Sequence, residues 1–340
     1  MRRPNAPTLI GFVLVGLVVA WLVVNLAKTP ADFLNNLIIG ITNGAVYGLI
    51  AIGYSLVYGI LELINFAHGD VFMLGGMLTA TLVASPGLVS GDAWYTILGS
   101  ILLMLLAAMA FCGVLNASIE RVAYRRLRHA PRLAPLITAI GMSFILQNVG
   151  LIWKGARPVS VNNILPQGNI FSLPIGSGVD YTWDKGIVLV ITVPVLIALT
   201  YLVQRTRRGK AMRATAQDRE AAAMMGIDVD RTVSFTFLVA GALAGVGGTI
   251  FAFYASTIRY DTGFTLGLFA FTAAVLGGIG NLPGAVLGAV LIGLIQAWNE
   301  GLPWHTPGPA WTQSIVFSIL ILILVFRPQG LLGERTPEGS

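Results

Sequence analysis

Long apolar runs without a charged residue limit most strongly how this chain can fold. Residues 186–203 and 232–258 contain no Asp, Glu, Lys or Arg. A run of about 18 or more such residues is long enough to cross the hydrocarbon core of a bilayer as a helix. Of the 340 residues, 11% are charged, whereas soluble domains have about 25%. The sequence therefore predicts an all-α, polytopic membrane protein.

Candidate spans occur along the whole chain. The uncharged stretch 262–299 is too long for one crossing of about 30 Å, because a helix rises about 1.5 Å per residue. It must turn, and the Gly- and Pro-containing residues 277–284 are where it can turn. If the short pieces on either side are half-helices that meet within the membrane, the number of full spans falls. We expect eight to ten transmembrane helices, some of them broken, at residues 9–27, 33–61, 71–84, 95–119, 133–153, 186–203, 232–255, 264–277, 284–298 and 311–326.

The distribution of basic residues predicts the orientation, because Lys and Arg favour cytoplasmic loops. With a cytoplasmic N-terminus, 16 of the 21 Lys and Arg residues fall in segments expected inside and 5 in segments expected outside. We therefore expect both termini in the cytoplasm, with residues 205–231 on that side. Residues 154–185 are then a structured external loop, since they are long and contain several Pro and Gly. No linker divides the chain, so residues 1–340 are expected to form a single transmembrane domain.

The segment 205–231 is the longest polar, charge-dense part of the chain and reads RTRRGKAMRATAQDREAAAMMGIDVDR. Its middle, residues 217–225, is rich in Ala, Met and Glu, which favour helix. Gly226 follows where a helix would stop. The pattern predicts a short surface helix at the cytoplasmic face.

Glu220, Ala221 and Ala222, followed by Gly226, resemble the "EAA" loop of ABC importers. In that family the loop is a short helix that docks into a groove on the ATPase. Three further stretches are similar to the LivH-type permease of branched-chain amino acid ABC transporters. They are INFAHGD at residues 64–70, AFTAAVLGGIGNLPGAVLGAVLIG at residues 270–293 and FRPQGLLG at residues 326–333. The resemblance covers the chain from about residue 33 to the end.

The resemblance implies a permease subunit in the inner (plasma) membrane. It would carry leucine, isoleucine or valine from a periplasmic binding protein to the cytoplasm by ATP-driven alternating access. The implied partners are a second permease subunit, two ATP-binding subunits and that binding protein. The chain has no G-x-x-x-x-G-K-[ST] motif, so ATP must bind a separate subunit, and we expect neither an enzyme nor a bound cofactor. The residues expected in the ATPase-coupling loop are Arg213, Glu220, Ala221 and Gly226.

Two polar interruptions of the apolar pattern have two interpretations each. Residues 62–70 contain two acids, an Asn and a His between apolar runs. They form either a tight cytoplasmic turn, with Asn65 and Asp70 capping helix ends, or a broken helix that lines the translocation pathway. Residues 277–284 are likewise a pathway lining or a simple turn, and we favour the lining, because a break in the membrane must satisfy its backbone groups. The candidate pathway residues are Asn65, His68, Gly278, Gly280 and Asn281.

The sequence also bears on other classes of protein and on other substrates. The three His residues are far apart and no Cys/His spacing suits zinc, so no metal site and no catalytic residue is expected. The net charge of +6 comes from loops between spans and does not indicate nucleic acid, although membrane lipid is an expected contact. An ion-coupled secondary transporter would need charges deep in the spans, where only Glu62 and Asp70 qualify. Urea, amides and other amino acids, which related permeases carry, remain alternative substrates.

Glycine pairs four residues apart predict close helix packing, because helices without Cβ atoms at the contact can approach closely. Such pairs occur at Gly44/Gly48, Gly241/Gly245 and Gly284/Gly288. With 40 glycines in the chain, some of these spacings are expected by chance.

Overall fold

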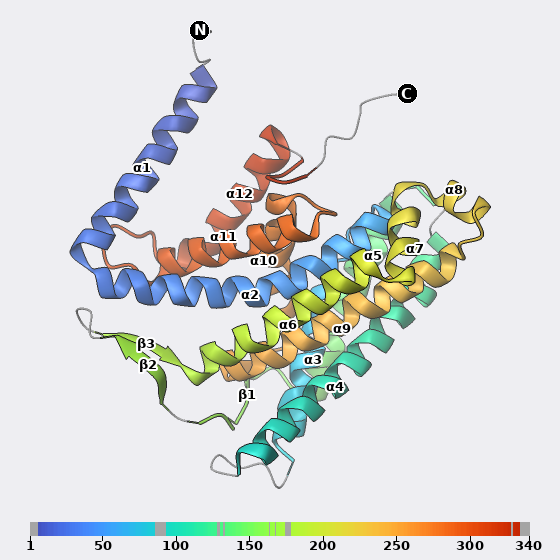
Figure 1. Cartoon of the computed structure of the whole chain (residues 1–340), viewed down its shortest axis with the longest axis horizontal. Helices are drawn as coiled ribbons and strands as arrows, with labels where there is room; N and C mark the ends of the chain where they lie inside the picture. The colour runs from blue at the N-terminus through green and yellow to red at the C-terminus, as the bar shows by residue number, and fades with distance from the viewer. Residues whose placement is uncertain are drawn as a thin grey trace.

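The chain is a polytopic helical membrane protein, as predicted (Figure 1). The structure, a computed structural model, describes residues 6–85, 93–127, 130–131, 133–162, 164–166, 168–173, 178–327 and 329–333. Its α-helices are α1 (Ala6–Lys28), α2 (Pro30–Leu61), α3 (Ala67–Val83), α4 (Trp94–Ile119), α5 (Leu133–Lys154), α6 (Trp183–Arg205), α7 (Arg207–Gln217), α8 (Arg219–Met224), α9 (Val229–Ala255), α10 (Thr262–Gly277), α11 (Leu282–Gly301) and α12 (Thr312–Phe326). Shorter elements are η1 (Glu120–Tyr124), η2 (Arg125–Leu127), η3 (Pro309–Trp311), β1 (Val159–Ser160), β2 (Asn169–Leu173), β3 (Val179–Thr182) and β4 (Thr257–Ile258).

Seven helical segments in the described part of the chain are long and apolar enough to cross a membrane. They are α2, α4 with η1 and η2, α5, α6, α9, α11, and η3 with α12. Helices α3 and α10, with 17 and 16 residues, are shorter, and for α10 this agrees with the half-helix alternative. The expectation of a short helix at residues 284–298 was wrong, because α11 extends over 20 residues. The break at residues 277–284 therefore separates one short helix from one of full length.

Close contacts between glycine-containing helices hold the centre of the bundle together. Helices α2 and α11 run antiparallel, and a Cβ on Gly44 would come within 2.6 Å of the Val290 Cα. Helices α9 and α4 touch at Gly245, where a Cβ would lie 2.3 Å from the Ala108 carbonyl oxygen. Gly48 leaves more room, since its Cβ would be 3.7 Å from Ala289. A Cβ at Gly241, Gly284 or Gly288 would also collide with backbone atoms. The glycine spacing therefore predicted close helix contacts at every paired position except Gly48.

One end of the bundle carries short strands that the sequence analysis did not predict. Strand β1 pairs with β4, and β2 with β3 forms an antiparallel hairpin within the expected external loop (Figure 1). The Asn35 side chain at the start of α2 binds this hairpin. It donates to the Gly178 carbonyl at 3.0 Å and accepts from the Asp180 amide at 3.2 Å. The β2–β3 hairpin is therefore structured and hydrogen-bonded to α2.

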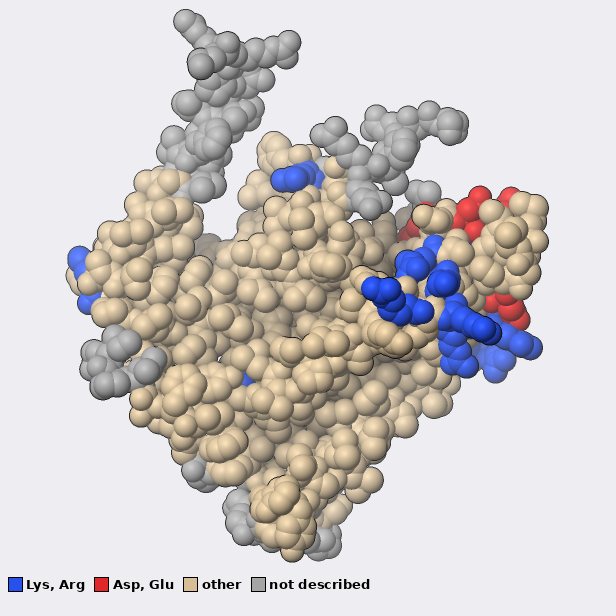
Figure 2. All heavy atoms as spheres, viewed as in Figure 1, with Lys and Arg blue, Asp and Glu red and all other residues tan. Residues whose placement is uncertain are grey.

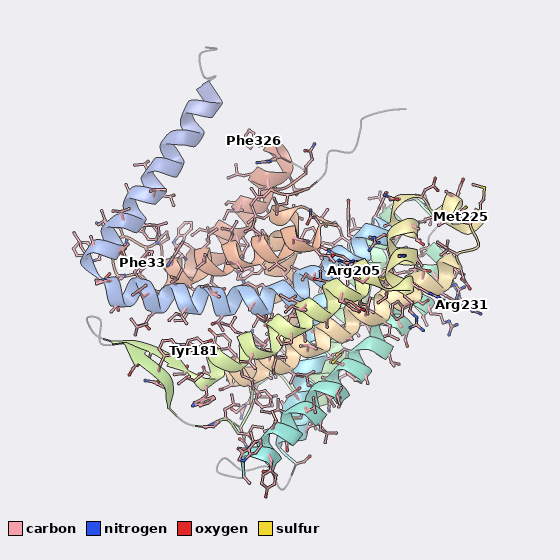
Figure 3. The ribbon with its side chains drawn as sticks, in the orientation of Figure 1. Phe33, Tyr181, Arg205, Met225, Arg231 and Phe326 are labelled. Carbon is pink, nitrogen blue, oxygen red and sulfur yellow. The ribbon has the colours of Figure 1, made fainter. Side chains whose placement is uncertain are left out.

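The opposite end carries a cluster of basic residues. Figure 2 shows Lys and Arg gathered around α7 and the start of α9, with Asp and Glu nearby, while the face in view has few other charged residues. Figure 3 labels Tyr181 in the hairpin at one end and Met225 and Arg231 at the other. Arg125 forms an ion pair with Asp230, which joins η2 to the start of α9. A cationic end and an apolar middle are typical of a membrane protein with one predominantly basic face.

Candidate functional site

The short helix predicted over residues 217–225 is present as α8, and a second helix, α7, which was not predicted, precedes it. Helix α7 ends at Gln217, and Asp218 is extended, with φ −155° and ψ 113°. The Asp218 side chain accepts hydrogen bonds from the amides of Glu220 and Ala221, both at 2.9 Å. An Asp at this position satisfies amides that have no partner within a helix, so it starts α8 as a separate unit.

Gly226 ends α8, as the sequence predicted. Its φ of +81° lies in the left-handed region that favours glycine. The Gly226 amide donates to the Ala223 carbonyl at 3.0 Å, and the Ile227 amide donates to the Ala222 carbonyl at 3.1 Å. This pair of bonds is the Schellman arrangement, which satisfies the last carbonyls of a helix. Helix α8 is thus fixed at both ends by local hydrogen bonds.

The side chains of α8 divide into an inward and an outward set. Ala222 is buried and Ala221 is half-buried, whereas Glu220 is exposed. Met224 and Met225 are 82% and 83% exposed, and Figure 3 shows Met225 at the far edge of the molecule. Flexible apolar side chains that are exposed on the surface are suited to contact with another protein.

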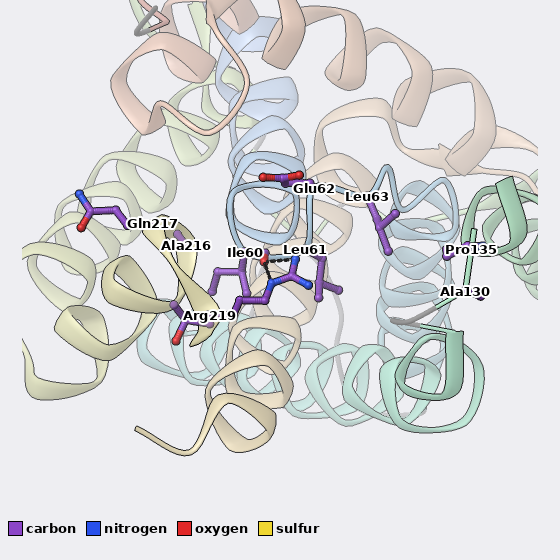
Figure 4. A pocket seen from close by; sticks show the side chains of 10 residues that line it. Ile60, Leu61, Glu62, Leu63, Ala130, Pro135, Ala216, Gln217 and Arg219 are labelled. Atoms are coloured by element: carbon purple, nitrogen blue, oxygen red, sulfur yellow. Dashed lines mark hydrogen bonds between the residues drawn. The ribbon is translucent and has the colours of Figure 1, made fainter. Parts of the chain in front are cut away.

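Arg213, predicted for the coupling loop, binds within the chain. Its guanidinium donates to the carbonyl of Val203 near the end of α6. Sequence reasoning missed Arg219, whose Nε and Nη2 donate to the carbonyl of Ile60 at 3.1 and 2.7 Å (Figure 4). No local pattern signals this contact, because the two residues are 159 positions apart. A cavity of about 260 Å³ lies beside it, lined by the end of α2, by residues 215–217 and by Ala130 and Pro135.

The first predicted break lies directly after α2. Glu62 adopts a left-handed conformation with φ 55°, and the chain then leads to α3. Asn65 is buried, where its amide accepts a hydrogen bond from the Tyr124 hydroxyl at 2.8 Å and donates to Asn116 at 3.4 Å. Among the described residues, neither Asn65 nor Asp70 caps a helix with its side chain, and Asp70 accepts from the Ser143 hydroxyl instead. The capping roles in the turn interpretation were therefore wrong.

His68 lies deeper in the bundle than Asn65. Its side chain is fully buried, and its ring packs edge-on against Tyr54 with the ring centroids 5.0 Å apart. The ring occupies the space left by Gly53, where a Cβ would lie 2.1 Å from His68 Nε2. The backbone of Ile50 is the polar group that interacts with the ring, but neither ring nitrogen makes a hydrogen bond of standard geometry in the described part of the chain. Burial of an imidazole with so little hydrogen bonding costs free energy.

The second predicted break is covered by the end of the chain. The amides of Leu331 and Leu332 donate to the carbonyls of Leu276 and Gly277 at 2.8 and 2.9 Å. Asn281 accepts from the Gly284 amide at 2.9 Å, which caps α11, and donates to the Leu332 carbonyl at 2.8 Å. The unpaired carbonyls at the end of α10 thus find partners within the chain. This removes the reason for which a pathway lining was favoured at this break.

The five predicted pathway residues do not form one site. Asn65 faces α4 and η1, His68 faces α2, and Asn281 faces the C-terminal segment. Gly278 contacts Gly330 and Gly333, whereas Gly280 has open space where its side chain would be. What the breaks share is the carboxyl end of α2. A Cβ on Gly59, in its last turn, would lie 3.8 Å from the Gly280 Cα.

Among the described residues, no group of three His, Cys, Asp or Glu side chains is placed to hold a metal ion. Cys112 is buried, with its thiol directed at the Val71 carbonyl at 3.3 Å. The candidate site is the exposed short helix α8 together with the carboxyl end of α2, to which Arg219 of α8 donates hydrogen bonds.

Comparison with known proteins places the chain in a family. Residues 36–325 match the family model of the branched-chain amino acid transport system permease component. The high-affinity branched-chain amino acid transport system permease protein BraD of Pseudomonas aeruginosa is 39% identical over 313 residues, which cover 90% of this chain and 97% of that protein. The corresponding protein LivH of Escherichia coli is 35% identical over 306 residues, with the same coverage of 90% and 97%.

A more distant relative is the autoinducer 2 import system permease protein LsrC of Yersinia pestis, which is 27% identical over 270 residues, or 74% of this chain and 70% of that protein. No solved structure matches the chain. The family model covers most of the chain and includes both helix breaks and the segment that contains α8. The chain belongs to the family of branched-chain amino acid transport system permease components.

Proposed function

We propose that this chain is the membrane-spanning permease subunit of an ABC importer for branched-chain amino acids. The observation that supports this most directly is the geometry of α8 in a chain of this family. Six residues form a helix fixed by Asp218 at one end and Gly226 at the other, and they present Glu220 and Met224 to the outside. A rigid helix with an acidic and an apolar exposed side is suited to enter a groove on an ATP-binding subunit.

The proposed assembly has four further components. A second permease subunit completes the pathway, two ATP-binding subunits meet the charged ends of the permeases, and a periplasmic binding protein delivers the amino acid. The complex lies in the inner membrane with both termini of this chain in the cytoplasm. The β2–β3 hairpin, at the end opposite α8, is then on the side of the binding protein.

The chain itself makes and breaks no covalent bond in this proposal. ATP is bound and hydrolysed by the separate subunits, and this chain converts their movement into alternating access. Polar groups at the helix breaks, at Asn65, His68, Gly278, Gly280 and Asn281, would meet the zwitterionic substrate as it passes. Only weak contacts are required, because the binding protein selects the substrate.

The substrate class rests on the relatives. Those at 35% and 39% identity are named for branched-chain amino acids, whereas the permease named for autoinducer 2 is 27% identical. Branched-chain amino acids are therefore proposed ahead of urea, amides or other amino acids. An ion-coupled secondary transporter is the remaining alternative, and it would need no ATP-binding subunit.

Co-purification tests the proposal. A tagged chain, extracted in mild detergent from its own cells, should carry ATP-binding subunits and a second permease. After reconstitution with the binding protein, the complex should take up radiolabelled leucine only when ATP is enclosed on the side of α8. Isolation without any ATP-binding subunit, combined with uptake driven by an ion gradient, would favour the secondary transporter instead.

A further inference from the structure

Arg219 connects the exposed helix α8 to the central helix of the bundle. Its guanidinium donates two hydrogen bonds, of 3.1 and 2.7 Å, to the single carbonyl oxygen of Ile60 (Figure 4). Ile60 lies in the last turn of α2, where carbonyls have no partner within the helix. A positive charge is also favourable at this end of a helix, because the helix dipole is negative there. The contact therefore combines a charge-assisted hydrogen bond with dipole compensation.

Within the described residues, the two hydrogen bonds of Arg219 are the side-chain hydrogen bonds that run from α8 to a membrane-spanning helix. The other hydrogen bonds of α8 are local, from the Asp218 cap at its start to the Gly226 turn at its end. The apolar contacts are also limited, since Ala222 is the one fully buried residue of the six. Arg219 is therefore the direct polar link from α8 to α2, whereas the packed route between them passes through α7.

The carboxyl end of α2 is where such movement would have the largest effect. Glu62 and the left-handed turn follow Ile60 and lead into the Asn65 segment. Gly59, one residue before Ile60, faces Gly280 in the second break. A displacement of this helix end would therefore bear on both breaks at once, although the breaks share no side-chain hydrogen bond among the described residues.

We propose that Arg219 is the positioning residue that transmits the movement of α8 to the carboxyl end of α2. This inference rests on the proposed function, in which α8 follows an ATP-binding subunit. Glu220 and Met224 are exposed and hold the partner, while Arg219, facing the opposite way, holds the membrane helix. Docking and transmission thus belong to adjacent residues of one short helix.

The experiment distinguishes binding of the ATP-binding subunits from the coupling of ATP hydrolysis to leucine uptake. Complexes containing wild-type chain, Arg219→Ala or Arg219→Lys are purified through a tag on this chain and reconstituted with the binding protein. ATP hydrolysis and leucine uptake are measured in the same vesicles. For Arg219→Ala we expect the ATP-binding subunits to co-purify and ATP hydrolysis to stay near the wild-type rate, while leucine uptake per ATP falls about tenfold. Arg219→Lys, which can still donate to the carbonyl, should lie between the two.

Arg126→Ala is the matched control, because Arg126 is an exposed arginine at the same end of the bundle with no hydrogen bond or ion pair among the described residues. It should leave uptake per ATP unchanged. The inference is overturned if Arg219→Ala keeps wild-type uptake per ATP, or if it releases the ATP-binding subunits, since Arg219 would then only shape the docking helix. If wild-type chain binds no ATP-binding subunit, the proposed function itself fails.

Discussion

The Tyr124 hydroxyl donates a hydrogen bond of 2.8 Å to the side-chain oxygen of Asn65, which joins η1 to the break after α2. The other half of the Asn65 amide donates to Asn116 at 3.4 Å, and Asn116 in turn donates to the Phe237 carbonyl at 2.7 Å. This chain of bonds links the break to α4 and α9. Both polar ends of Asn65 are therefore engaged within the subunit in the conformation described.

Asn65→Ala should destabilise the protein, because Tyr124 and Asn116 then lose a partner in a buried place. A buried polar group left without a partner costs about 1–3 kcal/mol. Thermal unfolding in detergent should report this loss. In a double-mutant cycle, Tyr124→Phe should cost much less in the Asn65→Ala background than alone. Normal thermal stability with strongly reduced transport would instead assign Asn65 to the pathway.

Gly53→Ala should be destabilising because its Cβ would lie 2.1 Å from Nε2 of the buried His68 ring. Forcing an extra carbon into a packed interior costs about 1–3 kcal/mol. Removing the imidazole with His68→Ala should relieve the collision, so the double variant should be more stable than the sum of the two single effects predicts. Strictly additive effects on unfolding temperature would contradict the described contact.

The same pair of variants tests whether His68 serves the pathway. If it does, the double variant should express normally and still transport leucine poorly. Gly53→Ala with His68→Asn, which restores a smaller polar side chain, is the matched comparison. If the double variant Gly53→Ala/His68→Ala regains both stability and leucine transport, His68 has a packing role only.

Gly226→Val should uncouple transport from ATP hydrolysis without preventing membrane insertion. The φ of +81° at Gly226 is strained for a β-branched residue, at a cost of about 1–3 kcal/mol. The strain falls on the turn that ends α8, so it should disturb the docking helix before it affects the spans. Gly226→Asn is the matched control, since Asn tolerates this conformation better. Wild-type transport in Gly226→Val would count against the role of α8.

Asn281→Ala should weaken the attachment of the C-terminal segment to the second break. The substitution removes the cap on the Gly284 amide and the hydrogen bond to the Leu332 carbonyl. Loss of such a cap costs about 1 kcal/mol. Asn281→Asp keeps the accepting oxygen, so it should lower the unfolding temperature less than Asn281→Ala does. A transport defect in both variants at unchanged stability would support contact with the substrate.

Reporter fusions should place residues 154–185 and the C-terminal end on opposite sides of the membrane. The structure puts the β2–β3 hairpin at one end of the bundle and the basic residues around α7 at the other (Figure 2). Phosphatase activity is expected from a fusion in the hairpin, and cytoplasmic fluorescence from a fusion at the C-terminus. If the two fusion sites lay on one side of the membrane, only one of the two reporters would be active, which would contradict the orientation predicted from the basic residues.

The sequence by itself determined the class of fold, the family and the end of α8. Uncharged runs longer than a bilayer crossing leave little choice but membrane helices, because backbone groups in lipid must bond to one another. Gly226 was predictable because a left-handed residue after a short helix is a local requirement. The start of α8 also has a local signal, Asp218 before Glu220, whereas α7 was not predicted.

The tertiary structure alone decided what the polar residues of the breaks touch. Leu331 and Leu332 reach back more than fifty positions to the end of α10, and Arg219 bonds to Ile60 across 159 positions. Sequence patterns that predict helices and turns extend over only a few residues, so they cannot predict hydrogen-bond partners this far apart in the chain. Both contacts arise because packing brings helix ends with unpaired carbonyls next to donors from distant segments, and satisfying those carbonyls out of water is strongly favoured.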